Sequence, residues 1–237
     1  MQTSKQLLTT KQIAFVAVFA ALQAVLSSLP YTITIGVSGQ ITLGVIGAPL
    51  IGILLGPYLG GLGVLIGSLI GVFVNPAGAF FGFFSVLPPS LGAVGAGFTM
   101  QKRGYVPGAV ILVSLLAFYA HPYGRASLFY PWLHIIAIVV ALVSTQLKGW
   151  VSNSLNIQKL SLTIPVAAFV GTLTDHMFGS ALGIWYYNIP PTVWDLIMFV
   201  YPLERIVVVI ATSLIGVPLL YSLHKAGLLE VSRQSLS

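Results

Sequence analysis

The chain has 237 residues, of which 57% are apolar and only 6% are charged. Soluble domains carry about 25% charged residues, so this composition excludes an ordinary soluble domain and predicts a membrane protein. Ten basic and four acidic residues give a net charge of +6, and the absence of cysteine excludes disulfide bonds, thiolate metal sites and cysteine nucleophiles.

Eight apolar segments follow one another along the chain, and their continuous apolar character indicates helices rather than the alternating strands of a barrel. They are residues 12–29, 41–55, 58–74, 79–100, 106–120, 131–147, 161–178 and 194–222. A spanning helix needs about 20 residues, so the second and fifth segments are short. The sequence therefore predicts an all-α, polytopic transmembrane helix bundle with six to eight spans.

The division between the second and third segments rests on Gly56 and Pro57. Proline lacks a backbone donor and disfavours helix at the residue before it, which predicts a tight helical hairpin at this point. We expect residues 1–237 to form a single integral membrane domain, with short polar tails at 1–11 and 224–237.

The basic residues predict the orientation of the bundle. With the N-terminus inside, eight of the ten fall on the cytoplasmic side, Arg125 lies in an outer loop and Arg205 lies within the last segment. The eight are Lys5, Lys11, Lys102, Arg103, Lys148, Lys159, Lys225 and Arg233. This distribution predicts a multi-pass protein of the cell membrane with both termini in the cytoplasm.

Small residues recur at every fourth position in the second and third segments, which places them on one helix face. The positions are Gly44, Ala48, Gly52, Gly56 and Gly60, and then Gly63, Gly67 and Gly71. Such faces let helices approach closely in lipid, so we expect them to pack inside the chain. Ala17 and Ala21, with Ala20 and Ala24 one residue offset, form a similar face on the first segment. That face either packs within the chain or contacts another subunit.

Three stretches carry features of a known family. They are residues 14–26 with their alanine face, residues 54–60 (LLGPYLG) followed by Gly63, Gly67 and Gly71, and residues 169–176 (FVGTLTDH) with residues 201–205 (YPLER). Together they resemble the substrate-binding S component of energy-coupling factor (ECF) transporters, and the third stretch is similar to archaeal-type members. The likeness covers about two thirds of the chain in pattern, and the extra spans beyond the family's usual six are expected within residues 106–147.

The resemblance implies an ABC-type import function. An S component captures a vitamin or another small micronutrient from outside, and a transmembrane coupling subunit with two ATPase subunits drives its uptake. The face formed by Ala17, Ala21, Ala20 and Ala24 would contact the coupling subunit. The glycine pattern ends on Asn75, where many S components have an acidic residue, which makes Asn75 a candidate substrate-binding residue. No GxxxxGK[ST] motif is present, so energy would come from partners or from an ion gradient.

Ionisable residues inside the last two segments form the second group of candidates, because such residues are costly in a membrane. Asp175 and His176 lie in the seventh segment, and Glu204 and Arg205 lie in the eighth. We expect them to form the polar floor of a substrate site, with Arg205 facing Asp175 and Glu204 facing His176 or a substrate amine. Structural pairing alone and proton coupling remain open alternatives.

Aromatic residues concentrate in the predicted outer loops, where they form either an interfacial belt or the walls of a site. Trp132, Trp185 and Tyr186 are the candidate wall residues, and Arg125 is a candidate for recruiting an anionic substrate group. Neither an HExxH nor a GxSxG motif occurs, and we expect no catalytic activity, cofactor or metal.

These features predict an outward-facing substrate receptor for vitamin-like molecules, nucleobases or amino acids. Two other functions remain open. One is a stand-alone, ion-coupled secondary transporter, which intramembrane carboxylates would suit. The other is a structural or assembly membrane protein without a ligand.

Overall fold

The computed structural model describes residues 8–29, 33–35, 39–147 and 157–228. Lys5, Lys148 and Arg233 of the predicted cytoplasmic set lie outside the described residues, as do most of the two predicted polar tails. Helices make up nearly all of the described part, and the short strands β1 (Ile33–Ile35) and β2 (Gly39–Ile41) pair as an antiparallel hairpin.

Eight helices of 12 or more residues are described, and they match the eight predicted segments in order. They are α1 (Thr10–Ser28), α2 (Gly44–Leu55), α3 (Pro57–Val74), α4 (Leu87–Met100), α5 (Tyr105–Ala120), α7 (Trp132–Gln146), α8 (Ile157–Tyr187) and α9 (Pro191–Lys225). Three short elements join them: the 3-10 helices η1 (Pro76–Gly78) and η2 (Gly82–Val86), and helix α6 (Pro122–Ala126).

Five helices of the described part are long and apolar enough to cross a bilayer, which makes this a helical membrane protein. They are α1, α3, Gly82–Met100, α8 and α9, whereas α2, α5 and α7 are shorter apolar helices. Helix α9 carries an outward-facing apolar surface suited to lipid. Its exposed residues include Leu196, Phe199, Leu203, Ile206, Val207, Ile210 and Leu214.

The glycine ladders pack inside the chain, as predicted. Gly56 ends α2 with a positive φ of 79°, a conformation that glycine adopts without strain, and Pro57 begins α3. Across this hairpin a Cβ on Gly60 would lie 2.8 Å from the Cα of Gly52, which shows how closely the two backbones approach. The hairpin predicted at this site is confirmed.

The second half of the ladder contacts a different helix from the first. Gly63, Gly67 and Gly71 of α3 face α1, and a Cβ on Gly67 would collide with the carbonyl oxygen of Ala20 and lie 2.6 Å from the Cβ of Gln23. One turn further, a Cβ on Gly71 would lie 2.7 Å from the Cβ of Ser27. The sequence pattern predicted close packing of α3 but did not identify α1 as its partner.

Helix α8 is longer than the predicted segment, which ended at residue 178. It continues without a break to Tyr187, so Trp185 and Tyr186 lie on its last turn rather than in a loop. The residues from Gly179 to Ile184 are small or apolar, so the apolar segment continues beyond residue 178, and the chain then turns at Asn188, which has a positive φ of 50°.

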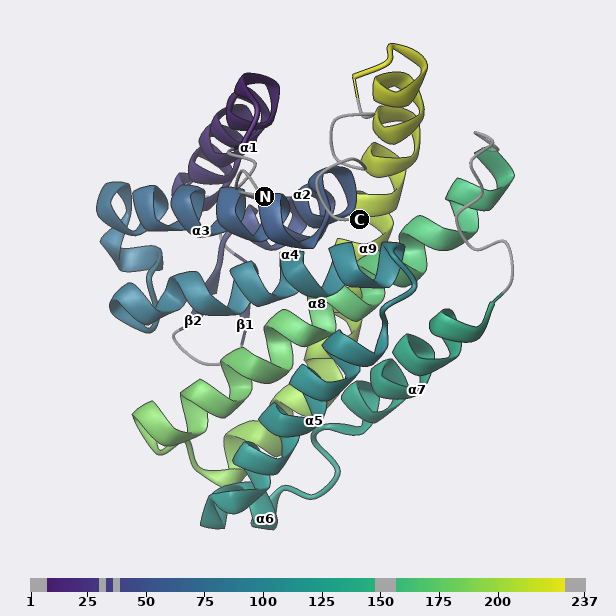
Figure 1. Ribbon diagram of the computed structural model, residues 1–237. Helices are drawn as coiled ribbons and strands as arrows, with labels where there is room; N and C mark the ends of the chain where they lie inside the picture. Colours follow the sequence, from purple (N-terminus) through teal and green to yellow (C-terminus); the bar gives the residue numbers. More distant parts are fainter. Residues whose placement is uncertain (1–7, 30–32, 36–38, 148–156, 229–237) are drawn as a thin grey trace, which may run out of the picture.

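The ends of α1 and α9 lie together at one end of the molecule, where Lys11 Nζ donates a hydrogen bond to the Gly227 carbonyl oxygen at 3.4 Å. Figure 1 shows α6 with the adjacent ends of α5 and α8 and the start of α9 at the opposite end. The β-hairpin and the segment between α3 and α4 also lie away from the Lys11 end (Figure 1). This arrangement leaves several connections on the side away from Lys11 and Gly227.

Candidate functional site

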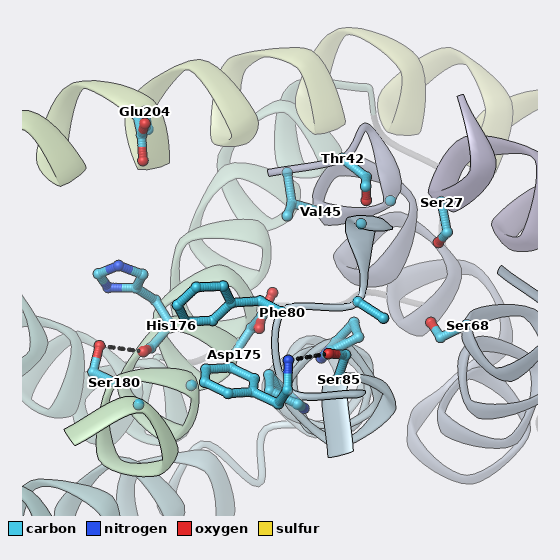
Figure 2. Close-up of a pocket in the computed structure, with 18 of the residues that line it drawn as sticks. Ser27, Thr42, Val45, Ser68, Phe80, Ser85, Asp175, His176, Ser180 and Glu204 are labelled. Atoms are coloured by element: carbon cyan, nitrogen blue, oxygen red, sulfur yellow. Dashed lines mark hydrogen bonds between the residues drawn. The ribbon is translucent and has the colours of Figure 1, made fainter. Parts of the chain in front are cut away.

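A cavity of about 300 Å³ lies between helices α1–α3 on one side and helices α8 and α9 on the other. The connection between α3 and α4, from Asn75 to Val86, covers it together with Pro88 and Pro89 at the start of α4, and most of the lining is apolar. Figure 2 shows Glu204 and His176 at one end of the cavity, Ser27 and Ser68 at the other, and Phe80 between them. The cavity therefore has a charged end and a neutral polar end, separated by aromatic and aliphatic side chains.

All four predicted floor residues line the charged end. Arg205 Nη2 lies 3.7 Å from Glu204 Oε2, and the two side chains are only 4% and 10% exposed. Arg205 also interacts electrostatically with Asp175 on the neighbouring helix. Neither carboxylate oxygen of Glu204 has a hydrogen-bond partner, and Nε of Arg205 has none either. The cluster thus holds buried charges with free hydrogen-bonding capacity next to a cavity.

A histidine pair supports this end. Nε2 of His134 on α7 lies 3.0 Å from Nδ1 of His176 on α8, so one of these nitrogens donates a hydrogen bond to the other. The Tyr201 ring of α9 stacks on both imidazoles, with ring centroids 5.3 Å from His134 and 4.7 Å from His176. Three helices are therefore joined through three stacked rings.

Two tyrosines fix the backbone next to the pair. Ser180 Oγ donates to the His176 carbonyl oxygen at 2.7 Å, so its only proton is used and Tyr130 Oη must donate to Ser180 Oγ, also at 2.7 Å. Tyr201 Oη donates to the Tyr130 carbonyl oxygen at 3.0 Å and accepts from the Leu133 backbone N–H at 3.3 Å. These bonds hold the wall of the charged end in one arrangement.

The neutral end is organised by Gln23, a buried amide on α1. Its Nε2 atom donates to the Gly44 carbonyl oxygen and lies at hydrogen-bonding distance from Ser68 Oγ and Ser27 Oγ, all at 3.3 Å. Its Oε1 atom is buried without a hydrogen-bond partner. Asn75, at the C-terminal cap of α3, also lines the cavity. The neutral end thus presents amide and hydroxyl groups.

Aromatic contacts attach the covering segment to the end of α8. The Tyr187 ring lies 4.6 Å from the Phe80 ring and 6.0 Å from the Phe81 ring, and Tyr187 Oη donates to the Phe80 carbonyl oxygen. Ser85 Oγ accepts from the Phe81 backbone N–H at 2.7 Å, as Figure 2 shows. We call this set of contacts the Tyr187 clasp.

Four predicted site residues lie outside the cavity lining. Trp185 and Tyr186 are exposed on the last turn of α8, and Trp185 Nε1 donates to the Ala117 carbonyl oxygen of α5 at 2.9 Å. Trp132 is exposed at the start of α7, and Arg125 on α6 donates to the Ala120 carbonyl oxygen at 3.2 Å. The aromatic wall of this cavity comes from Phe80, Phe81, Tyr130, Trp194 and Tyr201 instead.

The structure separates the four alanines of the predicted partner face. Ala20 and Ala24 are buried inside the chain, whereas Ala17 and Ala21 are exposed on α1. Only the second pair is therefore free to meet another subunit.

Sequence reasoning missed Gln23 and His134. Gln23 has an amide side chain in the middle of an apolar helix. Polar residues at membrane depth are rare, so the sequence alone could have identified this position as a candidate. His134 lies in the predicted segment 131–147 and carried the same signal, whereas its pairing with His176, 42 positions away in sequence, did not follow from the sequence. Within the described part of the chain, no group of three His, Asp or Glu side chains is placed to hold a metal ion.

No family model matches the chain, and no solved structure matches it. The chain is similar to an uncharacterized protein of Methanocaldococcus jannaschii, with 28% identity over 147 residues. The match covers 62% of this chain and 50% of that protein, so the chain spans about half the length of this relative.

Proposed function

We propose that the protein captures a small molecule in its intramembrane cavity and serves as the substrate-binding S component of an ECF-type importer. The observation that most directly supports this proposal is the buried carboxylate of Glu204, which faces the cavity without a hydrogen-bond partner. Arg205 Nη2 lies 3.7 Å from Glu204 Oε2 and supplies a positive charge but no hydrogen bond, and a buried carboxylate whose hydrogen bonds are unsatisfied costs several kcal/mol. A ligand that binds Glu204 offsets this cost.

The cavity also has the composition of a ligand site. Small-molecule sites are mostly apolar and carry a few polar groups that orient the ligand, and a volume of about 300 Å³ is at the lower end of their range. The cavity meets this description, with its polar groups at two separate ends. We propose that the protein lies in the cell membrane with both chain ends in the cytoplasm, and that the cavity receives its substrate from outside.

A partner surface is available on α1. Ala17 and Ala21 are exposed, and their small side chains give a flat helix face of the kind that packs closely against another helix in lipid. We propose that this face contacts the transmembrane coupling subunit, which works with two ATPase subunits. The resemblance of residues 14–26, 54–60, 169–176 and 201–205 to S components supports this assignment.

Co-purification tests the proposal. The chain is co-expressed with the ECF coupling subunit and its two ATPases and isolated in mild detergent through a tag on the chain. We expect all four proteins to be recovered together, and small-molecule uptake by vesicles that contain them to require ATP. Recovery of the chain alone, together with uptake that proceeds without ATP, would contradict the proposal.

A stand-alone secondary transporter is the second candidate. It is favoured by the hydrogen-bonded pair His134 and His176 beside Asp175, because such groups form proton relays in transporters. Uptake driven by a pH or sodium gradient in vesicles that contain this chain and no ATPase would support it over the first.

A further inference from the structure

The charges that line the cavity do not balance. Of the described residues in the lining, three carry a formal charge at neutral pH: Asp175, Glu204 and Arg205. Two carboxylates and one guanidinium leave one negative charge. Arg205 interacts electrostatically with both carboxylates, so it cannot fully compensate either of them. An uncompensated negative charge is unfavourable in a medium of low dielectric constant, and a bound positive group stabilises it.

We infer that the captured molecule carries an organic cation, such as a protonated amine, and that Glu204 is the residue that binds it. This inference rests on the proposed capture function and names the chemical class of the ligand. Both oxygens of Glu204 are free to accept hydrogen bonds, and an ammonium group carries donors and no acceptor. A charge-assisted hydrogen bond of this kind is about twice as strong as a neutral one.

The aromatic wall beside Glu204 supports the same ligand class. Tyr130, Trp194 and Tyr201 all line the cavity, and the Tyr130 ring lies 4.8 Å from the Trp194 ring and 5.3 Å from the Tyr201 ring. Electron-rich ring faces attract cations, and groups of such rings recognise ammonium ligands. A cation at the charged end therefore gains both from the carboxylate and from the rings.

The opposite end of the cavity defines the rest of the ligand. Gln23 lines this end with its Nε2 directed at the Ser27 and Ser68 hydroxyls, and Ser27, Ser68 and Asn75 also line the cavity. These groups are neutral. We infer that the ligand places its cationic group next to Glu204 and a neutral hydrogen-bonding group next to Gln23.

The inference is tested with matched pairs of probes. Purified full-length protein is incubated with an equimolar mixture that contains choline with 3,3-dimethylbutan-1-ol, phenethylamine with 2-phenylethanol, and similar amine and alcohol pairs, together with carboxylic acids of the same size. Retained molecules are quantified by mass spectrometry. We expect the protein to retain at least one cationic member at least tenfold more than its neutral counterpart. Glu204→Gln should abolish that preference.

Two further variants control the experiment. Asp195→Asn removes an exposed carboxylate from the same helix outside the cavity and should leave the preference unchanged. Glu204→Asp keeps the charge and should keep the preference, which separates loss of charge from a folding defect. Thermal unfolding of each variant verifies that it is folded.

The remaining outcomes overturn the inference. If neutral or anionic members are retained equally well, or if Glu204→Gln keeps the preference, the ligand is not a cation that Glu204 binds. Neither result would contradict the proposed capture of a small molecule. The first of these results would mean that a proton on Glu204 or on the histidine pair balances the charge, and the second would mean that another group of the lining, such as Asp175, binds the cation. If the wild-type protein retains no probe and carries no small molecule through purification, both the inference and the proposed function fail.

Discussion

The Nε2 atom of His134 lies 3.0 Å from the Nδ1 atom of His176, and the planes of the two imidazole rings differ by only 5°. This contact joins α7 to α8 directly beside the cavity. Tyr201 stacks on both rings, so the contact also holds α9 in place. His134 is completely buried and is not among the residues that line the cavity, whereas His176 lines it.

The first prediction concerns this pair. His134→Phe keeps a ring in the stack but leaves Nδ1 of His176 without a partner, and an unsatisfied buried group costs about 1–3 kcal/mol. We expect the unfolding temperature in detergent to fall accordingly. The double variant His134→Phe/His176→Phe should recover part of the loss, since both polar groups are then absent. If the loss of stability in the double variant equals the sum of the losses in the two single variants, the hydrogen bond does not couple α7 to α8.

The second prediction uses two glycines one turn apart on α3. At Gly67 a methyl group would collide with the Ala20 carbonyl oxygen, and overpacking of this kind costs about 1–3 kcal/mol. At Gly63 the nearest atom, the Val16 carbonyl oxygen, would be 3.7 Å away, which is an ordinary contact. We therefore expect Gly67→Ala to lower the unfolding temperature and Gly63→Ala to leave it nearly unchanged. Equal effects at both sites would show that α1 and α3 do not pack as described.

The third prediction separates the two faces of α1. Ala20 is only 4% exposed, so Ala20→Leu should destabilise the chain by about 1–3 kcal/mol through overpacking. Ala21 is exposed, and Ala21→Leu should change stability by no more than about 0.5 kcal/mol. If this face contacts the coupling subunit, Ala21→Leu should still lower the amount of coupling subunit recovered with the chain. Full recovery with Ala21→Leu and with Ala17→Leu would place the partner contact elsewhere.

The helices were predictable because membrane helices impose strong requirements on sequence. Continuous apolar runs of the right length leave few alternatives to helix, and Gly56 with Pro57 marked the break between α2 and α3. The end of α8 was predicted too early because the aromatic residues near Trp185 were taken as an interfacial loop. Aromatic residues favour the interface whether they stand in a loop or on a helix end, so composition alone does not separate the two cases.

The candidate site was predictable mainly where charge was involved, with Asn75 as the one non-ionisable residue that was predicted and lines the cavity. Asp175 and Glu204 stand out because a carboxylate in an apolar helix is costly, and both line the cavity. Which aromatic residues form the wall depends on helix rotation and on contacts between distant segments. Trp194 and Tyr201 line the cavity, whereas Trp132 and Trp185 do not, and nothing in the sequence distinguishes the two pairs.

The last prediction concerns the Tyr187 clasp and access to the cavity. The clasp attaches the segment that covers the cavity to α8, through ring contacts with Phe80 and Phe81 and a hydrogen bond to the Phe80 carbonyl oxygen. Tyr187→Ala removes all of these contacts. Because the hydrogen bond and both Tyr187 ring contacts are lost together, we expect the variant to open the cavity more often and admit a water-soluble reagent, although Tyr186 still contacts Phe81.

Cysteine labelling measures this opening, since the chain has no cysteine of its own. Val45→Cys introduces a single thiol into the cavity lining, and its rate of reaction with a maleimide reports access from water. We expect Tyr187→Ala to raise this rate severalfold and Tyr187→Phe, which keeps the ring, to raise it less. Trp185→Ala is the matched control, because Trp185 lies on the same turn but bonds to α5, and it should leave the rate unchanged. An equal rate with and without the Tyr187 ring would show that the covering segment does not limit access, and that molecules reach the cavity by another route.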